Sequence, residues 1–243
     1  MITLKEIEQK TMPPEKRKSA KNDFIAFYFG RPFSNFFTIP LLYTNITPNA
    51  VSVFSIFPCI SGFVLMCIGR TKGMLLLGWF MFALWNLCDG IDGTIARYKK
   101  QFSKLGSVYD AMAGYVAMVL TFFGYGVAAA HNPGWFQGHV NLPGEVYIIL
   151  GALSGIFMIF PRLVMHKAIT VTGSEASVSG VKEKGEFGIA KIIVLNFTSV
   201  SGLGHAIMFY VIFFTAMDTF TVCYFGLNLL VMLFSLKSIL KEN

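Results

Sequence analysis

The feature that most restricts the fold of this chain is a series of long stretches that contain no Asp, Glu, Lys or Arg. A helix of roughly 20 apolar residues crosses the ~30 Å hydrocarbon core of a bilayer. Because lipid offers no hydrogen bonds to an exposed backbone, such a stretch crosses the membrane as a helix. The chain contains six of them, at residues 50–69, 73–88, 111–130, 146–161, 192–217 and 219–236. These stretches predict an all-α integral membrane protein with six transmembrane helices.

The composition excludes the other broad classes of protein. Only 14% of the residues are charged, whereas a soluble domain carries about 25%. The chain also contains 25 Phe, 9 Tyr and 3 Trp residues, so too little polar surface remains to keep a compact body of this size in water. The fifth stretch holds several Gly and Ser residues next to His205, which predicts a kink or local unwinding there.

The positions of Lys and Arg predict the orientation of the six helices. Of the 20 Lys and Arg residues, only Arg70 and Lys72 fall in the loops on one side of the membrane. Because cytoplasmic loops carry the excess of positive charge, both termini are expected in the cytoplasm. The net charge of +7 is then juxtamembrane charge that faces membrane lipids, and no nucleic-acid partner is expected.

The residues before the first stretch form a separate part of the chain. Residues 22–43 combine many Phe and Leu side chains with Asp23 and Arg31. They are too polar to span a membrane and too apolar to be solvated, which is typical of an amphipathic segment in the membrane interface; a plain linker is the alternative. We therefore divide the chain into a cytoplasmic and interfacial segment, 1–48, and a six-helix membrane domain, 49–243.

Three aspartates at the expected cytoplasmic edge of the membrane predict a metal site. Asp89 and Asp92 are three residues apart and share one face of a helix, and Asp110 begins the next helix. If these helices are antiparallel neighbours, the three carboxylates converge. Like charges that close repel one another unless a cation neutralises them, and oxygen ligands without Cys or His suit Mg²⁺ or Mn²⁺. We expect Asp89, Asp92 and Asp110 to be the metal ligands.

Small residues and one arginine accompany the aspartates. Gly93 and Ala96 leave the helix surface open beside them, and Gly106 thins the facing helix. Arg97 offers a planar, permanently charged donor for a phosphate group. This combination suits a pyrophosphate that carries an organic tail. The alternative is that the acids cap helix ends and the glycines only pack helices.

The residues at 89–114 carry a resemblance to a known family. They read Asp89-x-x-Asp92-Gly93-x-x-Ala96-Arg97, then eight residues, then Gly106-x-x-x-Asp110. This pattern resembles the signature of the class I CDP-alcohol phosphotransferases, also called CDP-alcohol phosphatidyltransferases. The segment Ile46–Asn49, just before the first apolar stretch, also resembles the corresponding part of that family.

The resemblance implies a membrane enzyme whose aspartates hold one or two Mg²⁺ or Mn²⁺ ions. An acceptor hydroxyl attacks the phosphorus that bears the alcohol of a CDP-alcohol donor, and CMP leaves, in phospholipid or glycolipid synthesis. Asp110 is the expected catalytic residue, and a homodimer is implied as well. The residues expected to bind CDP are Asn49, Asp89, Gly93, Ala96, Arg97 and Gly106.

One position departs from the family pattern. The pattern has a further aspartate four residues after Asp110, where this chain has Gly114. In the family that carboxylate is the candidate general base and a metal ligand. Four interpretations stay open: Asp110 or a metal-bound water accepts the proton, another residue such as His166 replaces the base, no strong base is needed, or the protein binds CDP compounds without turnover.

A second candidate site is the basic cluster Arg162, His166 and Lys167 after the fourth stretch. It could hold the phosphate of an acceptor or of a lipid, and the ordinary excess of cytoplasmic positive charge explains it equally well. A cation transporter that uses the membrane aspartates is a further alternative. Their position at the membrane edge disfavours it, because transport sites lie near the midplane.

Overall fold

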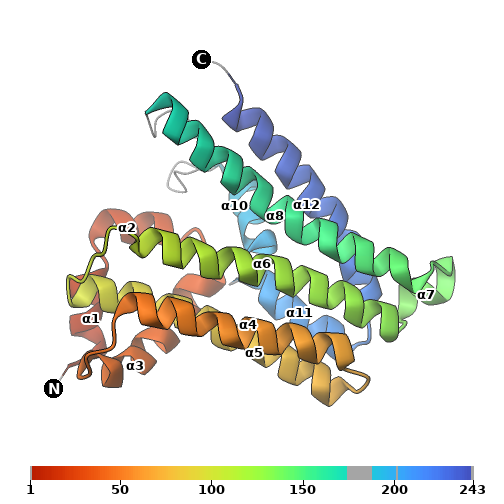
Figure 1. Ribbon diagram of the computed structural model, residues 1–243, viewed down its shortest axis with the longest axis horizontal. Coiled ribbons are helices and arrows are strands. Elements are labelled where there is room, and N and C mark those ends of the chain that lie inside the picture. The colour runs from red at the N-terminus through yellow and green to blue at the C-terminus, as the bar shows by residue number, and fades with distance from the viewer. Residues whose placement is uncertain (1, 174–187, 201, 242–243) are drawn as a thin grey trace.

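The computed structural model describes residues 2–173, 188–200 and 202–241, and the regular secondary structure of these residues is helical (Figure 1). Five helices are long and apolar enough to cross a membrane. They are α4 (Pro48–Ile68), α5 (Lys72–Tyr98), α6 (Gly106–His131), α8 (Gly144–Thr172) and α12 (Met217–Ile239). The protein is therefore an all-α integral membrane protein, as the apolar stretches predict.

The fifth apolar stretch forms two helices, α10 (Ile189–Thr198) and α11 (Leu203–Phe213), with an angle of 50° between them. Counted as one span, this pair brings the described spans to six. The interruption falls in the stretch of Ser and Gly residues before His205, where the sequence predicts it. Gly202 leaves room there, since a Cβ atom on it would lie 2.9 Å from a carboxylate oxygen of Asp23.

The long helices pack in an order that differs from their order in the sequence. Helix α4 packs along both α5 and α6, α6 packs along α8, and α8 packs along α12. Direct contact between α5 and α6 is slight, so α4 joins the two helices that carry the 89–114 motif (Figure 1). Helix α4 begins with a local cap, because the Thr47 hydroxyl accepts a hydrogen bond from the Ala50 N–H at 3.3 Å.

The end of the bundle opposite the motif is held by hydrogen bonds between helices. The buried Asp218 carboxylate accepts hydrogen bonds from the backbone N–H groups of Gly134 (3.0 Å) and Gln137 (2.8 Å) at the start of α7 (Trp135–Val140). Lys72 donates to the carbonyl of Phe213 at 2.8 Å. An anion at a helix N-terminus satisfies otherwise unpaired donors, so Asp218 is a structural residue here.

The N-terminal residues gather around the motif end of the bundle (Figure 1). They form α1 (Leu4–Thr11), α2 (Pro14–Ala20), η1 (Ala26–Gly30) and α3 (Arg31–Leu42). Ile7 is fully buried in one apolar cluster with Ile91 and Ile95 of α5, so the segment packs on the membrane domain. Its outward side carries exposed aromatic side chains, as an interfacial segment requires: Phe24, Tyr28, Phe29, Phe33, Phe36 and Phe37.

The orientation predicted from Lys and Arg leads to a labelling experiment. In a variant without the four native cysteines, we expect a membrane-impermeant maleimide to label His139→Cys on intact cells. Lys100→Cys should react only after the cells are permeabilised, because His139 in α7 and Lys100 after α5 lie at opposite ends of the long helices. The reverse pattern of labelling would overturn the orientation, and with it the cytoplasmic position of the motif.

Candidate functional site

A cavity of about 1580 Å³ opens at the motif end of the bundle. Its wall is built from the end of α5, the start of α6, the first turns of α4 and the N-terminal helices. The structure brings eight of the predicted site residues to this cavity: Asn49, Asp89, Asp92, Gly93, Ala96, Arg97, Gly106 and Asp110. The sequence predicted only that these residues lie near one another. In the structure, residues from α4, α5 and α6 line one cavity.

The three aspartates differ in their surroundings. The carboxyl groups of Asp89 and Asp110 lie within hydrogen-bonding range of one another across the α5–α6 gap. Asp92 is buried and accepts a hydrogen bond from the hydroxyl of Ser52 in α4. As they stand, the described residues include no group of three or more His, Cys, Asp or Glu side chains that could hold a metal ion. The three predicted ligands therefore line one cavity, but their carboxylates do not converge closely enough to form a metal-binding group.

The chemistry of these donors fits a divalent cation. The side chains are carboxylates, which suit Mg²⁺ and Mn²⁺ better than softer metals. Two ionised carboxylates as close as those of Asp89 and Asp110 repel one another, and a cation removes that repulsion. Gly93, next to Asp92, lines the same cavity.

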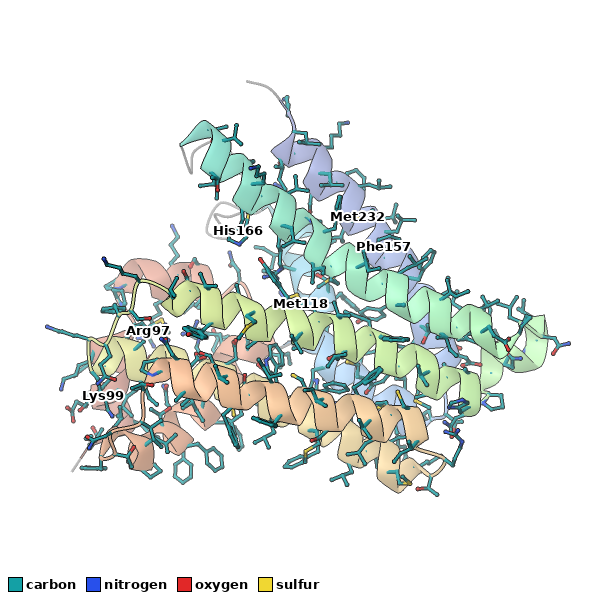
Figure 2. All side chains as sticks on the ribbon, in the orientation of Figure 1. Arg97, Lys99, Met118, Phe157, His166 and Met232 are labelled. Carbon is teal, nitrogen blue, oxygen red and sulfur yellow. The ribbon has the colours of Figure 1, made fainter. Side chains whose placement is uncertain are left out.

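Arg97 folds back along α5 toward the aspartates. A Cβ atom on Gly93 would lie 3.0 Å from an Nη atom of Arg97, so the glycine leaves the space that the guanidinium occupies. The Nε atom of Arg97 is buried and has no hydrogen-bond partner among the described residues. Figure 2 shows Arg97 at the end of the molecule where α5 ends and α6 begins. This side chain thus has a donor available to a ligand in the cavity.

Two serines that the sequence analysis did not single out position the predicted residues. Ser52 holds Asp92, as described above. Ser103, in the loop between α5 and α6, accepts a hydrogen bond from the side-chain amide of Asn49 at 3.0 Å. A Cβ atom on Gly106 would lie 3.2 Å from the same Ser103 hydroxyl. The absence of a side chain at Gly106 therefore lets Ser103 lie this close to the start of α6. The one signal in the sequence is the position of Ser52, about one helical turn after Asn49.

The N-terminal helices supply a wall of the cavity that sequence reasoning missed. Arg31 and Asn35 of α3 line it. A Cβ atom on Gly90 would lie 2.6 Å from the Ser34 hydroxyl oxygen, so only glycine lets α3 approach α5 this closely. The hydroxyl of Thr94 donates to the side-chain oxygen of Asn35 at 3.3 Å. The glycine beside Asp89 therefore packs α3 against α5.

Gly114 lies one helical turn after Asp110 on α6 and is not among the residues that line the cavity. A Cβ atom added there would meet no heavy atom within 4 Å. The glycine is therefore not required by a close contact between helices. A side chain at this position has room to extend.

The basic cluster predicted after the fourth stretch lies on α8, outside the cavity lining. Arg162, His166 and Lys167 are all exposed. Figure 2 shows His166 on the part of α8 that splays away from α6. Arg162 is nevertheless close enough for its charge to act on Asp89 and Asp110. The structure thus places one member of the cluster within electrostatic range of the aspartates.

Comparison with known families explains this arrangement. Residues 45–234 match the family described as CDP-alcohol phosphatidyltransferase. The chain belongs to this family. Its members are membrane transferases of lipid biosynthesis that use a CDP-alcohol donor and an alcohol acceptor, generally with a divalent metal. None of the curated proteins compared with the chain matches it.

Proposed function

We propose that this protein is an active, Mg²⁺- or Mn²⁺-dependent phosphotransferase that works at the cytoplasmic face of the membrane. It transfers a substituted phosphoryl group from a CDP-alcohol to a hydroxyl acceptor and releases CMP, in phospholipid or glycolipid synthesis. The observation that carries the proposal is the shared cavity, to which α5 and α6 bring Asp89, Asp92, Arg97 and Asp110. Both termini then lie in the cytoplasm, and the family resemblance leads us to expect a homodimer.

The residues of the cavity have different roles in this reaction. Asp89, Asp92 and Asp110 would hold the cation, which supplies Lewis-acid polarisation and a template for the pyrophosphate when bound. Arg97 donates to a phosphate oxygen with its planar fork. The CDP moiety lies against the Asn49 rim and the small residues of the motif, which are Gly93, Ala96 and Gly106, with the guanidinium of Arg97 beside Gly93.

The chemical step follows from this placement. The bond from the acceptor oxygen to phosphorus forms as the bond from phosphorus to the CMP oxygen breaks, and CMP carries away that electron pair. Asp110 is the most exposed of the three aspartates, so an acceptor can reach it from solvent or from the interface. Asp110 accepts the proton of the acceptor hydroxyl, a role that a positioned carboxylate can fill.

The purified protein in lipid vesicles provides the test. CDP-diacylglycerol and CDP-linked small alcohols are each supplied with candidate acceptors, and CMP release is measured with Mg²⁺, with Mn²⁺ and with a chelator. We expect release that the chelator abolishes. The glycine at 114 favours one alternative, a protein that binds CDP compounds without turnover, and CDP binding without CMP release would establish it. Ion flux in the absence of nucleotide would favour a transporter instead.

Arg97 offers a graded test of phosphate binding. Arg97→Ala should weaken CDP binding in the presence of Mg²⁺ by about 10- to 100-fold, because hydrogen bonds to charged groups are lost. Arg97→Lys keeps the charge and loses the forked contact, so its affinity should fall between those of Arg97→Ala and the wild type. Calorimetry with CDP measures both. If both variants bind CDP as the wild type does, Arg97 does not contact the nucleotide.

A further inference from the structure

The N-terminal helices place a second guanidinium group in the cavity, that of Arg31. This residue begins α3 and lines the same space as Arg97. It lies outside residues 45–234, the part of the chain that matches the family. The motif therefore does not account for a cation at this position.

Among the described side chains, Arg31 has no carboxylate partner within 4 Å. Within the described part of the chain, the ion pairs are Lys10–Glu6 and Arg17–Glu8. Within the described residues, the Arg31 guanidinium donates a hydrogen bond to the sulfur of Met12, at 3.7 Å. Burial lowers the pKa of Arg31, and the charge of Asp23 offsets this only in part. A partly buried guanidinium is thus left with its donors largely unused.

Arg31 and Arg97 are close enough for their charges to repel. The charges of Asp92, Asp110 and Asp89 act on Arg97 in the opposite sense, but a cation bound by these aspartates would compete for that charge, and an anion between the two guanidinium groups would relieve their repulsion. The unpartnered Nε atom of Arg97 adds a further unused donor on the same cavity. Guanidinium groups bind phosphate oxygens through two parallel hydrogen bonds, so a phosphate satisfies both residues at once.

We propose that Arg31 and Arg97 together bind a phosphate group carried by a substrate, so that α3 completes the site from outside the motif. The identity of that substrate rests on the proposed function: the phosphate belongs either to the diphosphate of the CDP donor or to a phosphorylated acceptor. Asp89, Asp92 and Asp110 are left free to hold the cation. Arg31 is then a substrate-binding residue of the N-terminal segment.

The first experiment compares Arg31→Gln with Lys21→Gln, a matched change at an exposed residue of the same segment that does not line the cavity. Binding of CDP, cytidine and inorganic phosphate is measured by calorimetry with Mg²⁺. Arg31→Gln should weaken binding of a phosphate-bearing probe by about 10- to 100-fold and leave cytidine binding unchanged. Lys21→Gln should bind all three probes as the wild type does.

The probes separate the two sources of the phosphate. Loss of CDP affinity in Arg31→Gln assigns the site to the donor. Unchanged CDP affinity with weakened inorganic phosphate binding assigns it to a phosphorylated acceptor. Unchanged binding of both probes overturns the proposal. If the wild type binds phosphate through Arg31 and neither binds CDP nor releases CMP, the proposed function fails while the phosphate site stands.

A second measurement uses the wild-type chain and so does not depend on how a variant folds. Phenylglyoxal modifies accessible arginines, and mass spectrometry follows each site separately. CDP or inorganic phosphate should slow the modification of Arg31 and Arg97 and leave that of Arg17, outside the cavity, unchanged. Modification of Arg31 at the same rate with and without both probes would overturn the proposal.

Discussion

Replacing Asp89 with Asn is expected to lower the rate of CMP release by about 10²–10³-fold. The Asp89 carboxyl group lies beside that of Asp110, and asparagine offers only a neutral oxygen to a cation at this place. Binding of Mn²⁺ should weaken in the same variant, and CDP binding should weaken with it. Steady-state CMP release, Mn²⁺ titration and calorimetry with CDP, each on the purified variant, measure the three effects.

The matched control is Glu145→Gln, which removes an exposed carboxylate in the first turn of α8, at the other end of the bundle. It should leave CMP release and Mn²⁺ binding unchanged. Without a metal, Asp89→Asn should not lower the unfolding temperature, because it removes repulsion between two adjacent carboxylates. Metal and CDP binding that are unchanged in Asp89→Asn would show that the aspartates do not form the proposed site.

Gly114→Asp is expected to raise CMP release by about 10²-fold, the lower end of what a positioned general base contributes. Gly114 does not line the cavity, but it lies one helical turn from Asp110 on the same face of α6, so the longer side chain of Asp can extend toward the site. The structure leaves room for it, since a Cβ atom at this position meets no heavy atom within 4 Å. A tighter second cation should accompany the gain in rate, and metal stoichiometry and turnover on this variant measure both.

Gly114→Asn provides the control, with nearly the same volume and no charge. It should give neither the gain in rate nor the additional cation. If Asp and Asn behave alike, the residue at 114 does not face the site. A fall in activity of Gly114→Asp together with tighter cation binding would show instead that the glycine makes room for a bulky substrate.

Local patterns in the sequence determined the secondary structure and the residues of the motif. An uncharged apolar stretch must become a helix in lipid whatever its neighbours are. Each span could therefore be predicted from its own stretch of sequence. The 3.6-residue period of a helix placed Asp89 and Asp92 on one face. Ser and Gly residues before His205 marked the break between α10 and α11, because they weaken a helix locally.

Contacts between distant residues were decided only by the tertiary structure. The hydrogen bond from Ser52 to Asp92 joins residues 40 apart in the chain, and the bond from Gly134 to Asp218 joins residues 84 apart. Neither carries a periodic signal. The composition of residues 22–43 predicts an interfacial segment, yet the position of α3 against Gly90 depends on how closely α3 and α5 approach.

The site itself shows the same division. The motif predicted which carboxylates and which arginine belong together, since they lie on two helices joined by a short loop. It did not predict Arg31, because nothing in residues 22–43 indicates which helix they cover. Hydropathy and helical periodicity indicate which face of a single segment is apolar and which is polar. The partner of each helix face depends on the packing of all the helices at once, and only the folded chain specifies that.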